Sequence, residues 1–213
     1  MEDFFPQVVF SVFGVPVYDT VVSTWVMMAL VLGAILLVRR FRPTGLELLI
    51  EVLEDMVADL MQHDVRRYLP FLGSLALFIA FANIISVVPF LVNPVNDINT
   101  PTALAVAVFF AVHYFGIQSQ GSGGYLKDLA TPVFVLPLEI ISQFSRTLSL
   151  TLRLFGNTIS TGMIVAVVFS LIPLLLPLPL IGFSIFTGFL QAYIFTALAA
   201  VYIDTGLEAP QTE

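Results

Sequence analysis

The sequence predicts an all-α integral membrane protein, with about five membrane-embedded helices and one amphipathic helix at the membrane interface. The composition supports this fold class, because 58% of the 213 residues are hydrophobic and only 11% are charged. An ordinary soluble domain carries about 25% charged residues. The charged residues are also separated by uncharged stretches long enough to cross a hydrocarbon core about 30 Å thick. The whole chain, residues 1–213, is expected to form a single membrane domain.

The same composition excludes several classes of function. The formal net charge of −7 argues against a nucleic-acid partner, which needs a basic face. The absence of cysteine excludes a disulfide framework and a thiol nucleophile. The sequence has no phosphate-binding glycine loop, zinc-protease motif or nucleophile elbow, and its two histidines, His63 and His113, are isolated. We therefore expect no cofactor, no metal and no nucleotide chemistry in this chain.

The first membrane span is expected at residues 20–38, a run of 19 uncharged residues that follows an outer N-terminal segment at residues 1–19. Five of the eight basic residues lie in the next part of the chain, between positions 39 and 67. Positive residues accumulate on the cytoplasmic side of a membrane. The N-terminus is therefore expected outside and, after the remaining spans, the C-terminus in the cytoplasm.

An amphipathic helix is expected at residues 45–65, within this basic loop. Acidic residues recur there at every fourth position, opposite an apolar stripe. Two interpretations remain open, because the helix could lie on the membrane surface or present its polar face to a soluble partner. The acidic positions are Glu47, Glu51, Asp55 and Asp59, and the apolar ones are Leu49, Leu53, Met56 and Leu60.

The second and third spans are expected at residues 68–92 and 102–117, joined by an outer loop rich in Asn and Pro. Residues Gln118–Gly124 have a composition typical of a flexible inner loop. The last helix is expected at residues 177–203.

The longest helix is expected at residues 131–172, where helix-breaking residues are sparse. A helix over this range would extend about 63 Å, roughly twice the thickness of the hydrocarbon core. It must therefore tilt, by around 60°, or break. The candidate bends are Pro137, Gly156 and Gly162.

A polar stripe runs along this long helix. Glu139, Arg146 and Arg153 are spaced by seven residues, about two helical turns, so they lie on one face. An unpaired Arg in hydrocarbon costs about 2.5 to 3.5 kcal/mol on insertion scales, so the stripe indicates the wall of a hydrated path. The polar residues on or beside this face are Ser142, Ser149, Asn157 and Ser160.

The charges of the stripe allow two interpretations. Glu139 could pair with Arg146 across two turns and simply stabilise the fold. Arg153 is different, because it lies in a tract of 75 residues, 129–203, with only three charges, and no carboxylate follows it until Asp204. Its counter-charge is therefore expected on another subunit.

The last helix carries Ser184, Thr187 and Gln191 on one face. Ser and Thr in membrane helices usually form hydrogen bonds within the protein. Gln191 is more costly to bury unpaired, so a partner such as Arg153 is expected.

The run SLTLRLFGN at residues 149–157 resembles the Arg-Leu-Phe-Gly-Asn segment in the long penultimate helix of subunit a of F-type ATP synthases. The run LQAYIF at residues 190–195 is similar to the family's Leu-Gln-Ala-Phe-Ile-Phe type of segment in the last helix. The outer-loop run DINT at residues 97–100 also looks like a family element, as do Glu139 and the pair at residues 145–146. The resemblance covers most of the chain.

The resemblance implies the stator channel subunit of a rotary, ion-translocating ATP synthase. The implied partners are a ring of c subunits with membrane carboxylates, b-type peripheral stalk subunits, the F1 sector and the lipid of an energy-transducing membrane, here a bacterial inner membrane. The last two helices would lie tilted against the ring. Arg153 would be the family's essential arginine, which favours the ionised ring carboxylate and bars a direct leak between two half-channels. Gln191 would face Arg153, Asn157 would lie beside it, and the cytoplasmic half-channel would be lined by Glu139, Ser142 and Arg146.

The chain departs from the family pattern in the outer half-channel. Many members have a Glu nine residues after the Arg and a His seven before the Gln, where this chain has Gly162 and Ser184. Oxygen ligands suit a hard cation, so both H⁺ and Na⁺ remain open as the transported ion. The outer half-channel is then expected to use water alone, or Asp97, Ser160, Thr161 and Ser184.

Two other functions remain open on the sequence. A stand-alone secondary ion transporter would use the same buried charges, but such transporters usually show internal repeats and broken helices in both halves. This sequence shows neither clearly. A structural membrane subunit without conduction would leave Arg153 unexplained.

Overall fold

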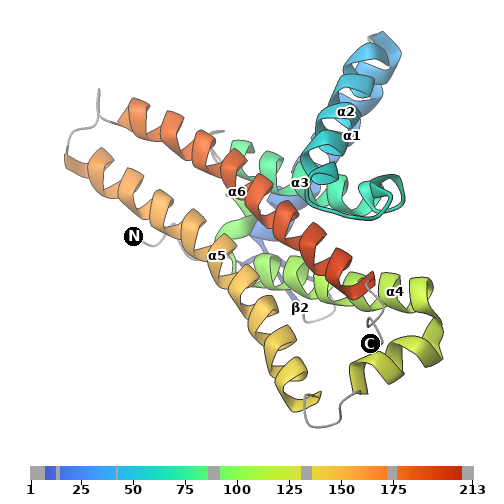
Figure 1. The fold of residues 1–213 in the computed structure, drawn as a ribbon. Coiled ribbons are helices and arrows are strands. Elements are labelled where there is room, and N and C mark those ends of the chain that lie inside the picture. Colours follow the sequence, from blue (N-terminus) through green and yellow to red (C-terminus); the bar gives the residue numbers. More distant parts are fainter. Residues whose placement is uncertain are drawn as a thin grey trace.

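The computed structural model describes residues 8–12, 15–41, 43–85, 92–130, 136–171 and 177–207, and helices dominate them (Figure 1). Residues 86–91 of the expected second span, and residues 131–135 and 172 of the expected long helix, lie outside the described residues. The same is true of residues 1–7 in the N-terminal segment.

The described part of the N-terminal segment forms a β-hairpin, which the sequence analysis did not predict. Strand β1, Val8–Val12, pairs antiparallel with β2, Val15–Tyr18. Both strands are rich in valine, whose β-branched side chain fits a pleated surface. Strand β2 leads directly into the first helix, where the Asp19 carboxylate accepts a hydrogen bond from the Thr20 backbone N–H at 2.8 Å.

Four helices among the described residues contain a stretch long and apolar enough to cross a membrane. They are α1 (Asp19–Phe41), α4 (Asn99–Ala130), α5 (Leu136–Leu171) and α6 (Pro177–Leu207). A shorter apolar helix, α3 (Leu69–Ile85), lies between α1 and α4 in the sequence. The prediction of an all-α membrane protein is confirmed.

The amphipathic helix ends earlier than predicted. Helix α2 spans Pro43–Ala58, and a short 3-10 helix, η2 (Val65–Arg67), follows it. The carboxylate of Asp64 accepts a hydrogen bond from the Arg66 backbone N–H at 3.2 Å and so caps the start of η2. The Asp64 backbone is extended, with φ −60° and ψ 108°, so one continuous helix cannot run through residue 65.

The expected loop at Gln118–Gly124 is wrong in extent, because helical residues on both sides meet at a kink at Gly121 and the second helical stretch reaches Ala130. The only non-helical backbone within α4 is at Gly121, with φ 77° and ψ 156°, a conformation that glycine adopts without a steric penalty. The helix therefore kinks at one residue and resumes. The kink turns Tyr125 back against Gly116, and Tyr125 is 6% exposed.

Helix α5 is continuous from Leu136 to Leu171, with no break at Gly156 or Gly162. Pro137 lies in its first turn, where the missing N–H would have no helical partner. The expected alternative of a broken helix is therefore wrong for the described residues.

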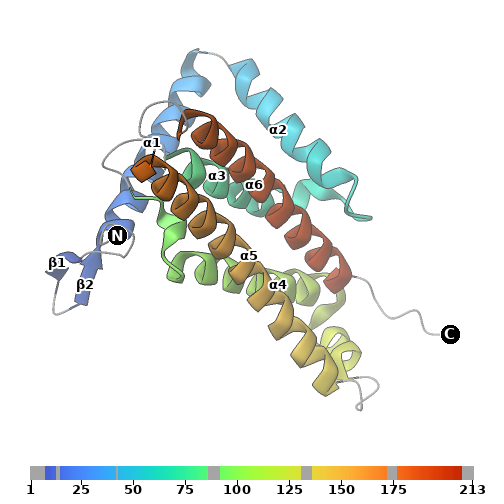
Figure 2. The same cartoon turned by 90° about the vertical axis from the view of Figure 1, so that its left-hand side faces the viewer.

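The core lies between α3 and α6, and α5 packs on α4 and α6. Helices α5 and α6 run antiparallel (Figure 2). The start of α5 and the ends of α4 and α6 meet at one end of the molecule, and the β-hairpin lies at the other (Figure 2). The core side chains shared by α3 and α6 include Leu72, Leu75, Ile79, Phe195 and Ile203.

Candidate functional site

A cavity of about 330 Å³ lies where α4, α5 and α6 meet. Its walls mix apolar side chains from α4 with polar and charged side chains from the first third of α5. The end of α6 closes it with Tyr202, Thr205 and Gly206. Polar and charged side chains from the stripe on α5 therefore line part of this cavity.

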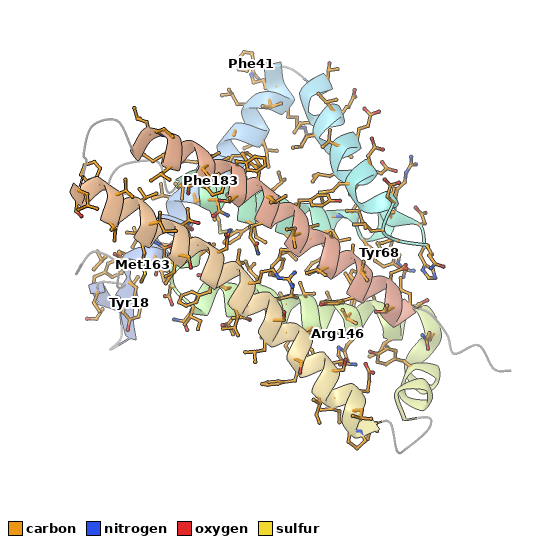
Figure 3. The ribbon with its side chains drawn as sticks, turned by 60° about the vertical axis from the view of Figure 1, so that its left-hand side comes forward. Tyr18, Phe41, Tyr68, Arg146, Met163 and Phe183 are labelled. Carbon is orange, nitrogen blue, oxygen red and sulfur yellow. The ribbon has the colours of Figure 1, made fainter. Side chains whose placement is uncertain are left out.

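Both charged residues in the first part of the stripe line this cavity. Glu139 and Arg146 are half-buried there, and Figure 3 shows Arg146 on α5 facing the neighbouring helices. The two do not form an ion pair. The Glu139 carboxylate accepts a hydrogen bond from Gln143 Nε2 at 3.1 Å, and the Arg146 guanidinium carbon lies 5.2 Å from the centroid of the Tyr202 ring, a cation–π geometry. The interpretation of these charges as a structural pair is therefore not supported.

Arg153 lies outside the cavity, on an exposed face of α5. The buried side of the helix at this level is formed by Leu150 and Leu154, at 2% and 0% exposure. The Arg153 guanidinium has no hydrogen bond or ion pair to any residue in the described part of the chain. Farther along α5 most of the exposed side chains are apolar, with Met163 and Ile164 at 50% and 55% exposure. A charge on such a surface needs a partner from outside the chain.

The uncharged polar residues of the stripe lie before and after Arg153 on α5. Asn157 and Thr161 are half-buried, and the Thr161 hydroxyl donates to the Asn157 carbonyl at 2.8 Å. This is the local bond that threonine commonly forms in a helix. The remaining predicted positions on this helix are Ser142, half-buried, with Ser149 and Ser160, which are exposed.

Gln191 is placed on α6 with 5% exposure, and its Nε2 has no hydrogen-bond partner among the described residues. The Arg153 guanidinium could donate only to Gln191 Oε1, and no such hydrogen bond is present among the described residues, although the sequence analysis named Arg153 as the partner. Ser184, two turns earlier on α6, is half-buried, and its carbonyl accepts a hydrogen bond from the Thr187 hydroxyl at 3.0 Å.

Asp97 belongs to a separate polar cluster next to the start of α4. It follows the 3-10 helix η3, Pro94–Asn96, and is 9% exposed. One carboxylate oxygen accepts hydrogen bonds from the backbone and side-chain nitrogens of Asn99, at 3.0 and 2.8 Å. The other accepts from the Thr20 hydroxyl on α1 at 3.4 Å. Asp97 is not among the residues that line the cavity.

The sequence matches the family model described as ATP synthase A chain over residues 21–204. The chain belongs to this family. An ATP synthase subunit a 2 from Bradyrhizobium sp. is 43% identical over 210 residues, covering 93% of this chain and 92% of that protein. The ATP synthase subunit a of Albidiferax ferrireducens is 42% identical over 195 residues, covering 86% and 84%. That of Moorella thermoacetica is 36% identical over 206 residues, covering 93% and 94%.

Membership of the ATP synthase A chain family, together with the long apolar helices, makes this chain a multi-pass membrane protein. The structure adds residues to the site that sequence reasoning missed. His113 and Tyr125 from α4 and Tyr202 from α6 line the same cavity as Glu139 and Arg146. No spacing rule could bring them together, because they lie on three different helices.

Proposed function

We propose that this ATP synthase A chain is the ion-conducting stator subunit of an F-type ATP synthase. In this proposal it passes protons to and from carboxylates on a ring of c subunits through two half-channels. The b-type peripheral stalk subunits and the F1 sector complete the complex. The observation that carries the proposal is Arg153, an outward-facing cation without a partner among the described residues. A ring carboxylate would supply the missing charge, and the field of Arg153 would favour its ionised form and so promote proton release.

The cavity between α4, α5 and α6 is proposed as the cytoplasmic half-channel. It places Glu139 and Arg146 below Arg153 on the same helix, and Ser142 and Ser149 continue the polar face. Water in a cavity of this polarity can hydrate both charges, which lowers the cost of keeping them inside a membrane.

The direction in which this cavity opens is supported by a contact between distant segments. His63 Nδ1 lies 2.8 Å from an Asp204 carboxylate oxygen, so the loop after α2 sits against the end of α6. That loop is followed by Arg66 and Arg67, and the end of α6 contributes to the cavity. Positive residues mark the cytoplasmic side. We therefore place the cavity and the C-terminus in the cytoplasm, and the N-terminus outside.

The outer half-channel is proposed to run near the end of α5 and the start of α6. Ser160, Thr161 and Ser184 are available there, with Asp97 at the outer end of α4 and Asn157 and Gln191 at the level of Arg153. Gly162 and Ser184 offer no titratable side chain, so water is proposed to carry the proton along most of this path.

The decisive experiment uses the complete F-type complex with Arg153→Ala, reconstituted into vesicles. We expect ATP-driven proton pumping to be lost while the subunit still copurifies with the c-ring, because only the partner of the ring carboxylate is removed. Arg67→Ala is the matched control, since Arg67 is exposed in η2 and lies outside the cavity. Coupled pumping by the Arg153→Ala complex would refute the proposal, and so would uptake of an ion by the chain alone.

The same vesicles identify the ion. Pumping that needs no sodium and acidifies the vesicle interior is the expected result for protons. Pumping that depends on added sodium and resists a protonophore would assign sodium to the same path.

A further inference from the structure

His113 is the one histidine of the described residues that faces the cavity. It lies on α4, opposite Glu139 and Arg146 of α5. The remaining titratable groups around the cavity are Tyr125, after the kink in α4, and Tyr202 on α6. The imidazole therefore lines the same cavity as the carboxylate and the guanidinium that the proposed half-channel uses.

The local structure fixes which ring nitrogen carries the proton. His113 Nδ1 lies 2.8 Å from the Phe109 carbonyl oxygen, four residues earlier in α4. A carbonyl oxygen can only accept, so Nδ1 must be the donor. In the neutral ring the other nitrogen, Nε2, then carries the lone pair. No described residue forms a hydrogen bond to Nε2.

Aromatic neighbours hold the ring in this orientation. The Phe109 ring centroid lies 4.4 Å from that of His113, and the Tyr125 ring meets it edge-on at 5.9 Å. The ring is half-buried. A basic nitrogen without a hydrogen-bond partner among the described residues thus lies beside a cavity large enough for several water molecules.

We propose that His113 is a proton-relay residue of this cavity. Nε2 takes a proton from cavity water, which gives an imidazolium still bonded through Nδ1–H to Phe109. It then returns that proton to the next water or to the Glu139 carboxylate, and the neutral ring is restored with no net change. Glu139 lines the same cavity and is the nearest carboxylate acceptor on α5 that this path offers. This role rests on the proposed function of the cavity as a half-channel.

The test compares two substitutions in the reconstituted complex. His113→Asn can keep a donor near the Phe109 carbonyl but has no atom at Nε2, and His113→Gln places an amide there that does not titrate. We expect both to assemble with the c-ring and to pump about tenfold more slowly, at the lower end of what proton-transfer groups contribute. Both should also flatten the dependence of the rate on cytoplasmic-side pH between about pH 5 and 8, the range in which histidine titrates.

The controls separate a relay from a structural role. His63→Gln removes the other histidine, which pairs with Asp204 outside the cavity, and should keep the wild-type pH profile. If the two His113 variants keep the wild-type rate and pH profile while Arg153→Ala abolishes pumping, this inference fails and the proposed function stands. If Arg153→Ala pumps normally, the proposed function itself fails.

Water access to this position can be measured directly, because the chain has no cysteine. In a complex without other reactive thiols, His113→Cys should react with a charged thiol reagent added on the cytoplasmic side. Tyr114→Cys is the matched control, since Tyr114 is 62% exposed on the outer surface of α4, where lipid would exclude the reagent. An unreactive His113→Cys would contradict the relay.

Discussion

The charged side chains of α5 differ in the contacts they make within the chain. Glu139 has Gln143, and Arg146 has the ring of Tyr202, so both are satisfied within the chain. Arg153 has neither kind of contact among the described residues. Arg153 is thus available to a neighbouring subunit. Substitutions at Glu139 or Arg146 should first disturb the packing of this chain itself.

Thr196 offers a test of an unsatisfied polar group. It is fully buried on α6, and its hydroxyl has no hydrogen-bond partner among the described residues. Thr196→Val keeps the shape and removes the hydroxyl, so we expect the subunit to gain about 1 kcal/mol of unfolding free energy. Denaturant titration of the detergent-solubilised protein measures this.

Thr158→Val is the control for that substitution. Thr158 is also buried, but its hydroxyl donates to the Leu154 carbonyl at 2.9 Å. Its loss should not stabilise the protein. A destabilising Thr196→Val would mean that the hydroxyl of Thr196 is satisfied in the membrane.

The helices of this subunit approach closely where glycine removes a side chain. A Cβ added at Gly116 of α4 would lie 2.8 Å from the Gly206 carbonyl oxygen of α6 and would also overlap the Tyr125 ring. The backbone carbonyl of Gly206 cannot move aside as a flexible side chain could. The kink at Gly121 depends on this gap, since it brings Tyr125 onto Gly116.

Gly116→Ala should therefore destabilise the subunit by about 1 to 3 kcal/mol, the usual cost of overpacking. Gly182→Ala is the matched control on α6, because nothing lies within 4 Å of a Cβ there. Thermal unfolding of both variants in detergent gives the comparison. Equal stability of the two would show that α4 and α6 are not in close contact.

Sequence patterns predicted the all-α membrane fold class, because composition and long uncharged runs indicate it. They were wrong in extent for α4, where the loop-like composition of Gln118–Gly124 corresponds to a kink at Gly121 with helical residues on both sides. They also missed the hairpin at Val8–Tyr18, whose pairing depends on contacts between strands. The stripe on α5 followed from the spacing of seven, whereas His113 required the tertiary fold.

At the scale of the whole subunit, hydrogen bonds join two distant segments at the end of the molecule where the cavity lies. The Asp204 carboxylate, 6% exposed on α6, accepts hydrogen bonds from the Gln62 backbone N–H at 3.2 Å and from His63 Nδ1 at 2.8 Å. These two bonds join residues that are 142 and 141 positions apart in the sequence. They hold the loop between α2 and α3 on the end of α6.

Asp204→Ala should release this loop and cost about 1 to 3 kcal/mol, because it removes the charged acceptor of these hydrogen bonds. Hydrogen exchange at the Gln62 amide should become faster than in the unchanged protein. Unchanged protection there would show that the loop is held by other contacts.

Arg66→Gln is the control for Asp204→Ala, because it breaks an ion pair that lies on the surface. Arg66 Nε donates to a Glu54 carboxylate oxygen at 3.0 Å, and this bond raises the pKa of Arg66. A raised pKa means that the stabilisation is complete at lower pH and is lost only as the pH rises through strongly alkaline values. We therefore expect Arg66→Gln to leave the stability and its pH dependence unchanged between about pH 5 and 8.

Helix α5 buries little of itself against its own chain, with 11% of the residues in its most apolar window enclosed. A newly synthesised subunit that has not yet assembled must then expose Arg153 to lipid acyl chains. The free-energy cost is about 2.5 to 3.5 kcal/mol or more. Such an orphan should be distorted, short-lived and readily recognised by membrane proteases. The amount of this subunit in a cell would then follow the supply of its assembly partners rather than its own rate of synthesis.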